Sequence, residues 1–142
     1  MDVRKILSEV AAIAGPSGQE LQVAEYFAEQ FRPLVDEVCI DNMFNVIAHK
    51  KGTGPRVMLC AHIDEVGLMT TDVEEDGSVR FLSLGVAAQT LPAQEVHILC
   101  EDGPVYGVIG AVPPHLTGED DRDRVTPVEE LFIDTGLPYN EV

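Results

Sequence analysis

The chain has 142 residues and is 45% hydrophobic, which suits one folded domain or one domain with a piece of another. Its net charge of −16 argues against binding to nucleic acids or to anionic membranes, because both need a positive surface. The sequence contains no apolar run of about 18 residues and begins with an amphipathic pattern, so neither a transmembrane helix nor a secretory signal is expected.

The first part of the chain has the pattern of two amphipathic helices. Apolar residues recur at helical spacing from Val3 to Ala14, and Gly15-Pro16 ends that helix. Ser17 and Glu20 have the spacing of a capping box, in which both side chains satisfy free backbone groups at the start of a helix. The second predicted helix follows and ends before Pro33.

Strands are expected after the second helix. Two short ones are predicted at Glu37–Ile40 and Val46–His49. The run Val57–Ala61 is apolar throughout, which indicates a fully buried strand of a sheet covered on both faces. Helices and strands therefore alternate up to about residue 66, as in α/β folds.

Beyond Gly67 the sequence has closely spaced strands with no helix between them. Two hairpins are predicted, with the strand pairs Leu68–Val73 and Val79–Leu84, then Val96–Cys100 and Val105–Ile109. A helix start is predicted at Thr126-Pro127 and a last short strand at Leu131–Asp134. This spacing predicts a small barrel or sandwich, so we place a domain boundary near Val66-Gly67.

The cysteines Cys39, Cys60 and Cys100 are odd in number, and each lies in an apolar run. This usage favours buried free thiols in a reducing compartment, so a cytoplasmic location is expected. They form no CxxC pair, which leaves a thiolate zinc site poorly supported.

The clearest candidates for functional residues are His62, Asp64 and Glu65, which directly follow the apolar run. In sheets flanked by helices, ligands bind at the carboxyl ends of strands. A neutral imidazole there can bind a divalent metal ion, while a nearby carboxylate accepts the other ring N–H and fixes the tautomer. A structural histidine is the alternative, because zinc generally takes four ligands and this segment offers few.

Several stretches, in this order, carry a resemblance to a known family: Gly15–Glu20, Val57–Gly67, Leu91–Gln94, Gly107–Gly110 running into Pro113–Leu116, and Leu131–Gly136. They resemble the co-catalytic metallo-aminopeptidases of peptidase family M42, which includes glutamyl and deblocking aminopeptidases and the enzymes that form tetrahedral particles. The resemblance covers essentially the whole chain and implies the N-terminal part of such an enzyme.

The resemblance implies a fold of two parts. The first is the α/β portion of a catalytic domain, with a mixed sheet flanked by helices, and the second is an inserted, β-rich, small barrel-like domain. By this analogy residues 1–66 begin the catalytic domain, and residues 67–142 belong to the inserted domain, which is incomplete here. The inserted domain serves subunit association in the family, so a homo-oligomer is expected.

The resemblance also implies a chemistry, in which metal-activated water attacks the N-terminal peptide bond of peptide substrates. The complete site holds two divalent ions, zinc or cobalt, with His62 as the ligand of one and Asp64 orienting His62. The family's other ligands and its general-base glutamate have no counterpart in this sequence, so the isolated chain is expected to be truncated and inactive. Two alternatives stay open: a non-catalytic module that assembles with itself or with a complete aminopeptidase, and one part of a split enzyme.

A few positions need a separate interpretation. Phe44 stands where the family has a glycine, and the left-handed backbone that glycine permits would strain phenylalanine, so an altered turn is expected. Gly107 and Gly110 indicate close packing beside a strand and not a phosphate-binding loop. For His115, which follows two prolines, a structural role is favoured over one at the entrance of the site. The acidic pairs Glu74-Glu75 and Glu129-Glu130 are expected to be solvated surface.

Overall fold

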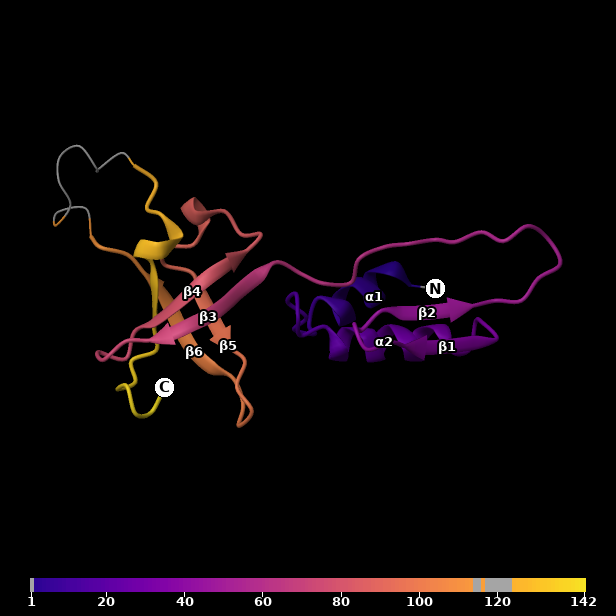
Figure 1. The fold of residues 1–142 in the computed structure, drawn as a ribbon, viewed down its shortest axis with the longest axis horizontal. Helices are drawn as coiled ribbons and strands as arrows, with labels where there is room; N and C mark the ends of the chain where they lie inside the picture. Colours follow the sequence, from indigo (N-terminus) through magenta and orange to yellow (C-terminus); the bar gives the residue numbers. More distant parts are fainter. Residues whose placement is uncertain (1, 114–115, 117–123) are drawn as a thin grey trace. The chain divides into compact units, whose positions relative to one another are not determined.

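The computed structural model describes residues 2–113, 116 and 124–142. They form two compact units, Met1–Val66 (the N-terminal unit) and Gly67–Val142 (the C-terminal unit), shown in Figure 1. The division falls where the sequence changes from mixed helices and strands to strands. The assignment of the units to a catalytic domain and an inserted association domain remains a prediction.

The first helix of the N-terminal unit, α1, spans Val3–Val10. The Asp2 carboxylate caps it by accepting a hydrogen bond of 3.0 Å from the N–H of Arg4. The helix is shorter than the predicted Val3–Ala14, because from Ala12 on the N–H groups bond three residues back and not four. Ile13, for example, donates to the carbonyl of Val10 at 3.1 Å. The chain therefore leaves the helix in a tight turn before Gly15-Pro16.

The second helix, α2, spans Leu21–Phe31, which confirms the predicted element and its end before Pro33. It packs against an antiparallel hairpin of β1 (Glu37–Ile40) and β2 (Val46–His49), whose predicted bounds are also confirmed (Figure 1). The described hydrophobic residues that are buried in this unit lie on α2: Val23, Ala24 and Ala28. Two small alanines allow close approach of the helix, but the core they make is small.

The turn between β1 and β2 has the left-handed backbone that its family position suggests, with Phe44 at φ 61°. Phenylalanine thus adopts the strained conformation itself, and an alteration relative to the family's turn stays a prediction. Asp41 explains how the strained conformation is tolerated. Its Oδ1 accepts the N–H groups of Met43 at 2.8 Å and Asn45 at 2.9 Å, and its Oδ2 accepts the Asn45 side-chain amide at 2.9 Å.

The apolar run Val57–Ala61 does not form the buried strand predicted for it. It carries no strand, and Val57, Met58 and Leu59 are 80%, 85% and 93% exposed. The reason is pairing: a central strand needs neighbours on both sides, whereas β1 and β2 pair only with each other.

The prediction of buried thiols is wrong as well, because Cys39, Cys60 and Cys100 are all exposed.

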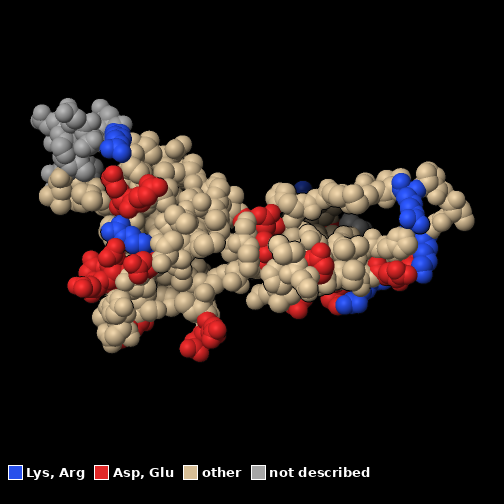
Figure 2. All heavy atoms as spheres, in the orientation of Figure 1, with Lys and Arg blue, Asp and Glu red and all other residues tan. Residues whose placement is uncertain are grey.

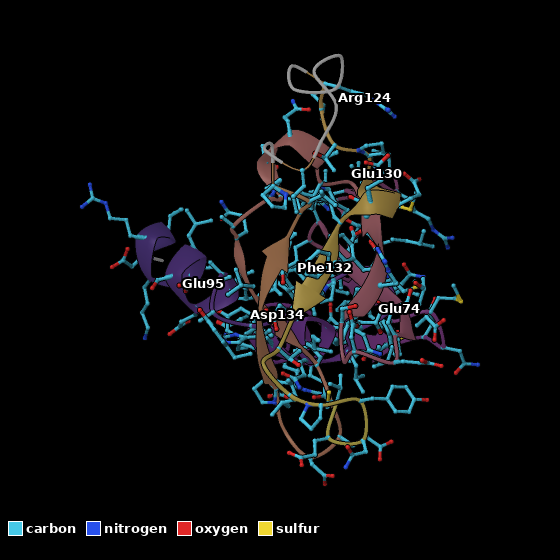
Figure 3. All side chains as sticks on the ribbon, turned by 90° about the vertical axis from the view of Figure 1, so that its left-hand side faces the viewer. Glu74, Glu95, Arg124, Glu130, Phe132 and Asp134 are labelled. Atoms are coloured by element: carbon cyan, nitrogen blue, oxygen red, sulfur yellow. The ribbon has the colours of Figure 1, made fainter. Side chains whose placement is uncertain are left out.

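The C-terminal unit is a curled antiparallel sheet with the strand order β3-β4-β7-β6-β5. Its strands are β3 (Gly67–Val73), β4 (Val79–Leu84), β5 (Glu95–Ile98), β6 (Val105–Gly110) and β7 (Phe132–Asp134). Both predicted hairpins are confirmed by the pairing of β3 with β4 and of β5 with β6. Figure 3 looks onto β7, which lies between β4 and β6 and carries Phe132 and Asp134.

Among its described residues, the C-terminal unit also has two short 3₁₀ turns, η1 at Ala88–Thr90 and η3 at Val128–Glu130. The predicted helix start at Thr126-Pro127 yields only this second turn, with Pro127 as its cap. The sheet encloses a core in which each side chain is at most 4% exposed: Val79, Phe81, Leu91, Ile109, Leu131 and Ile133. Gly107 and Gly110 are confirmed as close-packing residues, since a Cβ would collide with Ile133 at the first and with Phe132 at the second.

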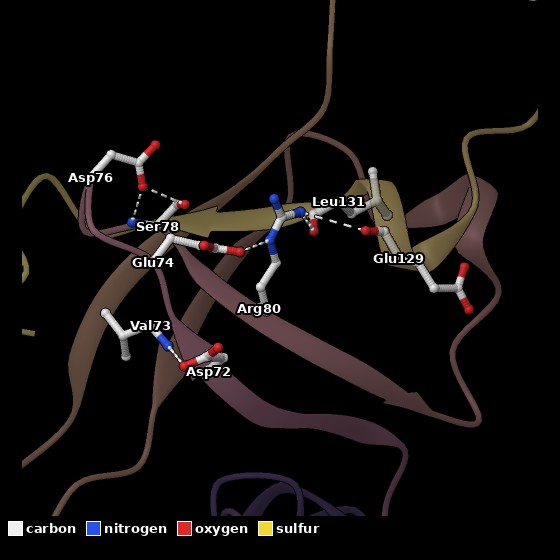
Figure 4. Close-up of polar contacts among 8 residues, drawn as sticks. All are labelled: Asp72, Val73, Glu74, Asp76, Ser78, Arg80, Glu129 and Leu131. Atoms are coloured by element: carbon white, nitrogen blue, oxygen red, sulfur yellow. Dashed lines mark hydrogen bonds and ion pairs between the residues drawn. The ribbon is translucent and has the colours of Figure 1, made fainter.

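Arg80 on β4 connects η3 and the Leu131 backbone that follows it to the sheet (Figure 4). Its Nε donates to Glu74 at 3.0 Å, and its guanidinium donates to the backbone carbonyls of Leu131 at 3.3 Å and Glu129 at 3.5 Å. Both acidic pairs, Glu74-Glu75 and Glu129-Glu130, are exposed as predicted.

Charged side chains are spread over the surface of both units. On the face drawn in Figure 2, acidic groups occur on each unit and basic groups lie near them. Among the described residues, the helices are too short and too polar to cross a membrane.

Candidate functional site

The segment that carries His62 and Asp64 lies beside the turn between α1 and α2. Glu65 makes this contact twice: its backbone N–H donates to the Gly15 carbonyl at 2.9 Å, and its Oε1 accepts the Gly15 N–H at 2.9 Å. A parallel bridge between Pro16 and Glu65 continues the contact. The Glu65 carboxylate is therefore engaged in holding two segments together, a role that the sequence could not reveal because the partners lie 50 residues apart.

The structure brings the two predicted site residues, His62 and Asp64, into contact. The ring Nδ1 of His62 lies 3.0 Å from Asp64 Oδ1 and 3.0 Å from the Asp64 backbone carbonyl. An ionised carboxylate and a carbonyl can only accept, so we assign the proton to Nδ1. In the neutral ring Nε2 then carries the lone pair, which is the form that can bind a metal ion.

The other carboxylate oxygen of Asp64 accepts the hydroxyl of Ser17, with Oγ and Oδ2 2.5 Å apart. Hydrogen bonds from Ser17 and then from His62 hold the pKa of the Asp64 carboxyl below its ordinary value. Each oxygen of Asp64 thus has its own donor, one from the turn after α1 and one from the imidazole.

This contact overturns the predicted capping box. The Ser17 hydroxyl does not cap α2, whose N-cap residue is Glu20 and which has no side-chain cap hydrogen bond. Glu20 accepts the Gly18 N–H at 2.8 Å, a bond within the turn that precedes the helix. Sequence reasoning missed the partnership of Ser17 with Asp64, because the local spacing of Ser17 and Glu20 suggested a role close by.

The described residues do not form a complete metal site. Within residues 2–113, 116 and 124–142, no group of three or more His, Cys, Asp or Glu side chains is arranged to hold a metal ion. His62 fits the role of a single ligand, because its side chain is 86% exposed and its Nδ1 is held by an acid. His49 lies near Glu37 on the β1–β2 hairpin, and His115 lies outside the described residues.

Comparison with known proteins identifies the family. The family model of the M42 glutamyl aminopeptidases matches residues 45–142. The chain belongs to this family. A lysyl aminopeptidase of Pyrococcus furiosus is 36% identical over 140 residues, which cover 96% of this chain. This M42 chain spans only about two fifths of the length of the P. furiosus enzyme, since the same match covers 40% of that protein.

Solved structures resemble the M42 chain closely. A TET aminopeptidase from the archaeon Thaumarchaeota archaeon SCGC AB-539-E09 matches with a TM-score of 0.89 and 31% identity, over 97% of this chain and 39% of its own. The TET1 peptidase of Pyrococcus horikoshii, which can assemble into a tetrahedron or a large octahedral shell, matches with a TM-score of 0.82 and 32% identity. That match covers 99% of this chain and 42% of the TET1 chain. The resemblance to aminopeptidases thus extends over both units.

Proposed function

We propose that this chain carries one ligand, His62, of a two-metal aminopeptidase site, with Asp64 holding the ring in its metal-binding tautomer. The observation that supports this most directly is the pair of 3.0 Å contacts from His62 Nδ1 to Asp64, which leave Nε2 with its lone pair. The bound ions, zinc or cobalt, would activate a water molecule for attack on the first peptide bond of a peptide.

A second part of the proposal is that the 142-residue chain hydrolyses no peptide by itself. Catalytic zinc sites use three protein ligands, whereas the described residues bring only one imidazole to the site. A general base must also lie within hydrogen-bond reach of the attacking water. The Glu65 carboxylate is already bonded to Gly15, which argues against Glu65 in that role.

Zinc titration of the full chain, followed by calorimetry and by ¹⁵N NMR of the histidine rings, tests the assignment of His62. We expect one weak site that shifts the His62 Nε2 resonance, that is lost in His62→Ala and that persists in His49→Ala. Two tightly bound ions per chain, or zinc shifts confined to another histidine, would contradict it. Leucyl and glutamyl anilides should show no turnover with the chain alone, with or without zinc.

We further propose that the C-terminal unit is the family's inserted, barrel-like association domain and that it supports a homo-oligomer. The assembly of the similar TET1 peptidase into closed particles supports this. A non-catalytic association module is the competing function, and zinc binding at His62, measured together with the mass in solution, separates the two. A defined oligomer without zinc binding at His62 favours the association module, whereas zinc binding at His62 favours the partial enzyme.

A further inference from the structure

Ser17 is a polar residue of the site, and its hydrogen-bond partner lies far from it in the sequence. It belongs to the turn between α1 and α2, yet its hydroxyl donates to Asp64 Oδ2 across 47 positions of the chain. At 2.5 Å, the Oγ–Oδ2 distance lies at the short end of the range for hydroxyl–carboxylate bonds, which are among the stronger hydrogen bonds in proteins. A serine that only shaped its turn would bond to nearby backbone groups.

We propose that Ser17 is a positioning residue for His62: its hydroxyl fixes the rotation of the Asp64 carboxylate, and that carboxylate fixes the imidazole. The inference rests on the proposed function, because the orientation of the ring matters to the reaction only if Nε2 binds a metal ion. Ser17 itself touches neither metal nor substrate in this assignment.

The exposure of the site explains why a hydrogen bond is needed for this task. The His62 side chain is 86% exposed and that of Asp64 is 38% exposed, so packing restrains the imidazole very little. The terminal torsion of an aspartate is broad, and a carboxylate held at one oxygen only can rotate away. With Oδ2 held by Ser17, Oδ1 remains directed at Nδ1 of His62.

Ser17 is itself held in place by its neighbours on both sides. On one side, Gly15 and Pro16 are joined to Glu65 by the two 2.9 Å hydrogen bonds and the parallel bridge. On the other side, Gly18 at φ 94° turns the chain, and its N–H donates to Glu20. The hydroxyl therefore comes from a fixed turn, as a positioning group requires.

The test is ¹⁵N NMR of the histidine rings in the full chain at pH ~8.5, about two units above the ordinary histidine pKa of ~6.5. In the wild type, His62 should be mainly the Nδ1–H tautomer. In Ser17→Ala the fraction of this tautomer should fall, because the Asp64 backbone carbonyl is then the only fixed acceptor for Nδ1–H, and in Ser17→Thr, which keeps the hydroxyl, it should be restored. The matched control is Ser78→Ala, since Ser78 makes a similar bond of 2.7 Å to Asp76 in the C-terminal unit.

An unchanged His62 tautomer in a folded Ser17→Ala chain would overturn the proposal. If Ser17→Ala does not fold, the wild type still decides: the Ser17 hydroxyl proton should be shifted downfield and protected from exchange, and an ordinary, rapidly exchanging hydroxyl would overturn the proposal.

Zinc titration separates this inference from the proposed function. If His62 binds zinc, Ser17→Ala should weaken binding by about threefold to tenfold, below the 10- to 100-fold loss typical of a direct partner of a ligand. Absence of any zinc shift at His62 in the wild type would defeat the proposed function and leave the tautomer result standing.

Discussion

The two units use their apolar residues in opposite ways. In the C-terminal unit, buried residues from the three strands β4, β6 and β7 and from two loops face one core, and Ile109, Leu131 and Ile133 are at most 2% exposed. In the N-terminal unit the most apolar stretch, Val57–Leu59, is at least 80% exposed and pairs with no strand. The difference shows that apolar sequence produces a strand only where partner strands are available to hydrogen-bond with it.

The largest change in stability is expected when a core residue of the C-terminal unit is truncated, which tests this contrast between the units. Ile133→Ala should lower the free energy of unfolding of the C-terminal unit by about 2–5 kcal/mol, because it leaves a cavity among well-packed side chains. Leu59→Ala, the matched change at a side chain 93% exposed, should change stability by less than about 0.5 kcal/mol. Urea unfolding followed by NMR signals of each unit measures both. A large loss in Leu59→Ala would show that Val57–Leu59 is buried in solution.

A smaller effect is expected at the turn between β1 and β2. Phe44 has φ 61°, so Phe44→Gly should raise the stability of the N-terminal unit by about 0.5–1 kcal/mol, as relief of left-handed strain outweighs the extra chain entropy of glycine. Met43→Gly, at a neighbouring position without positive φ, should instead cost about 0.5–1 kcal/mol. Thermal unfolding measures both variants, and a destabilised Phe44→Gly chain would mean that the aromatic ring contributes more through contacts than the strain costs.

The smallest effect concerns the pH dependence of the same turn. Hydrogen bonds from Asn45 and Met43 lower the pKa of Asp41 in the folded chain. The stabilisation by ionised Asp41 is therefore fully present above the ordinary aspartate pKa of about 3.9 and is lost as the pH falls through the lower folded value. Asp41→Asn should flatten this part of the acid unfolding profile of the N-terminal unit. Identical profiles for Asp41→Asn and wild type would contradict the assignment.

The local pattern of apolar and turn residues in the sequence was sufficient to predict much of the fold. The strands of both hairpins in the C-terminal unit, the β1–β2 hairpin and α2 follow from apolar spacing and turn residues, because each of these elements pairs with a neighbour in sequence. The same local reasoning failed at Val57–Ala61, whose burial depends on strands that are not adjacent in the chain. It also made α1 too long, since apolar spacing continues through Ile13 after the backbone has changed to three-residue bonds.

The candidate site shows the same limit. The contact between His62 and Asp64 could be predicted, because the two residues are close in sequence and a carboxylate commonly orients such a ring. The partners of Asp64 and Glu65 in the turn after α1 could not, since they lie 47 and 50 positions away. Ser17 was misassigned because its spacing from Glu20 fits a helix cap equally well.

The pair of bonds between Gly15 and Glu65 also bears on how the chain reaches its folded state. It closes a loop of about fifty residues that contains α2, β1 and β2, and long loops are slow to close because their ends must first meet by diffusion. The helix and the hairpin, built from nearby partners, form faster than such a contact. Assembly of the imidazole, carboxylate and hydroxyl should therefore be a late event, completed only after the elements between them have condensed.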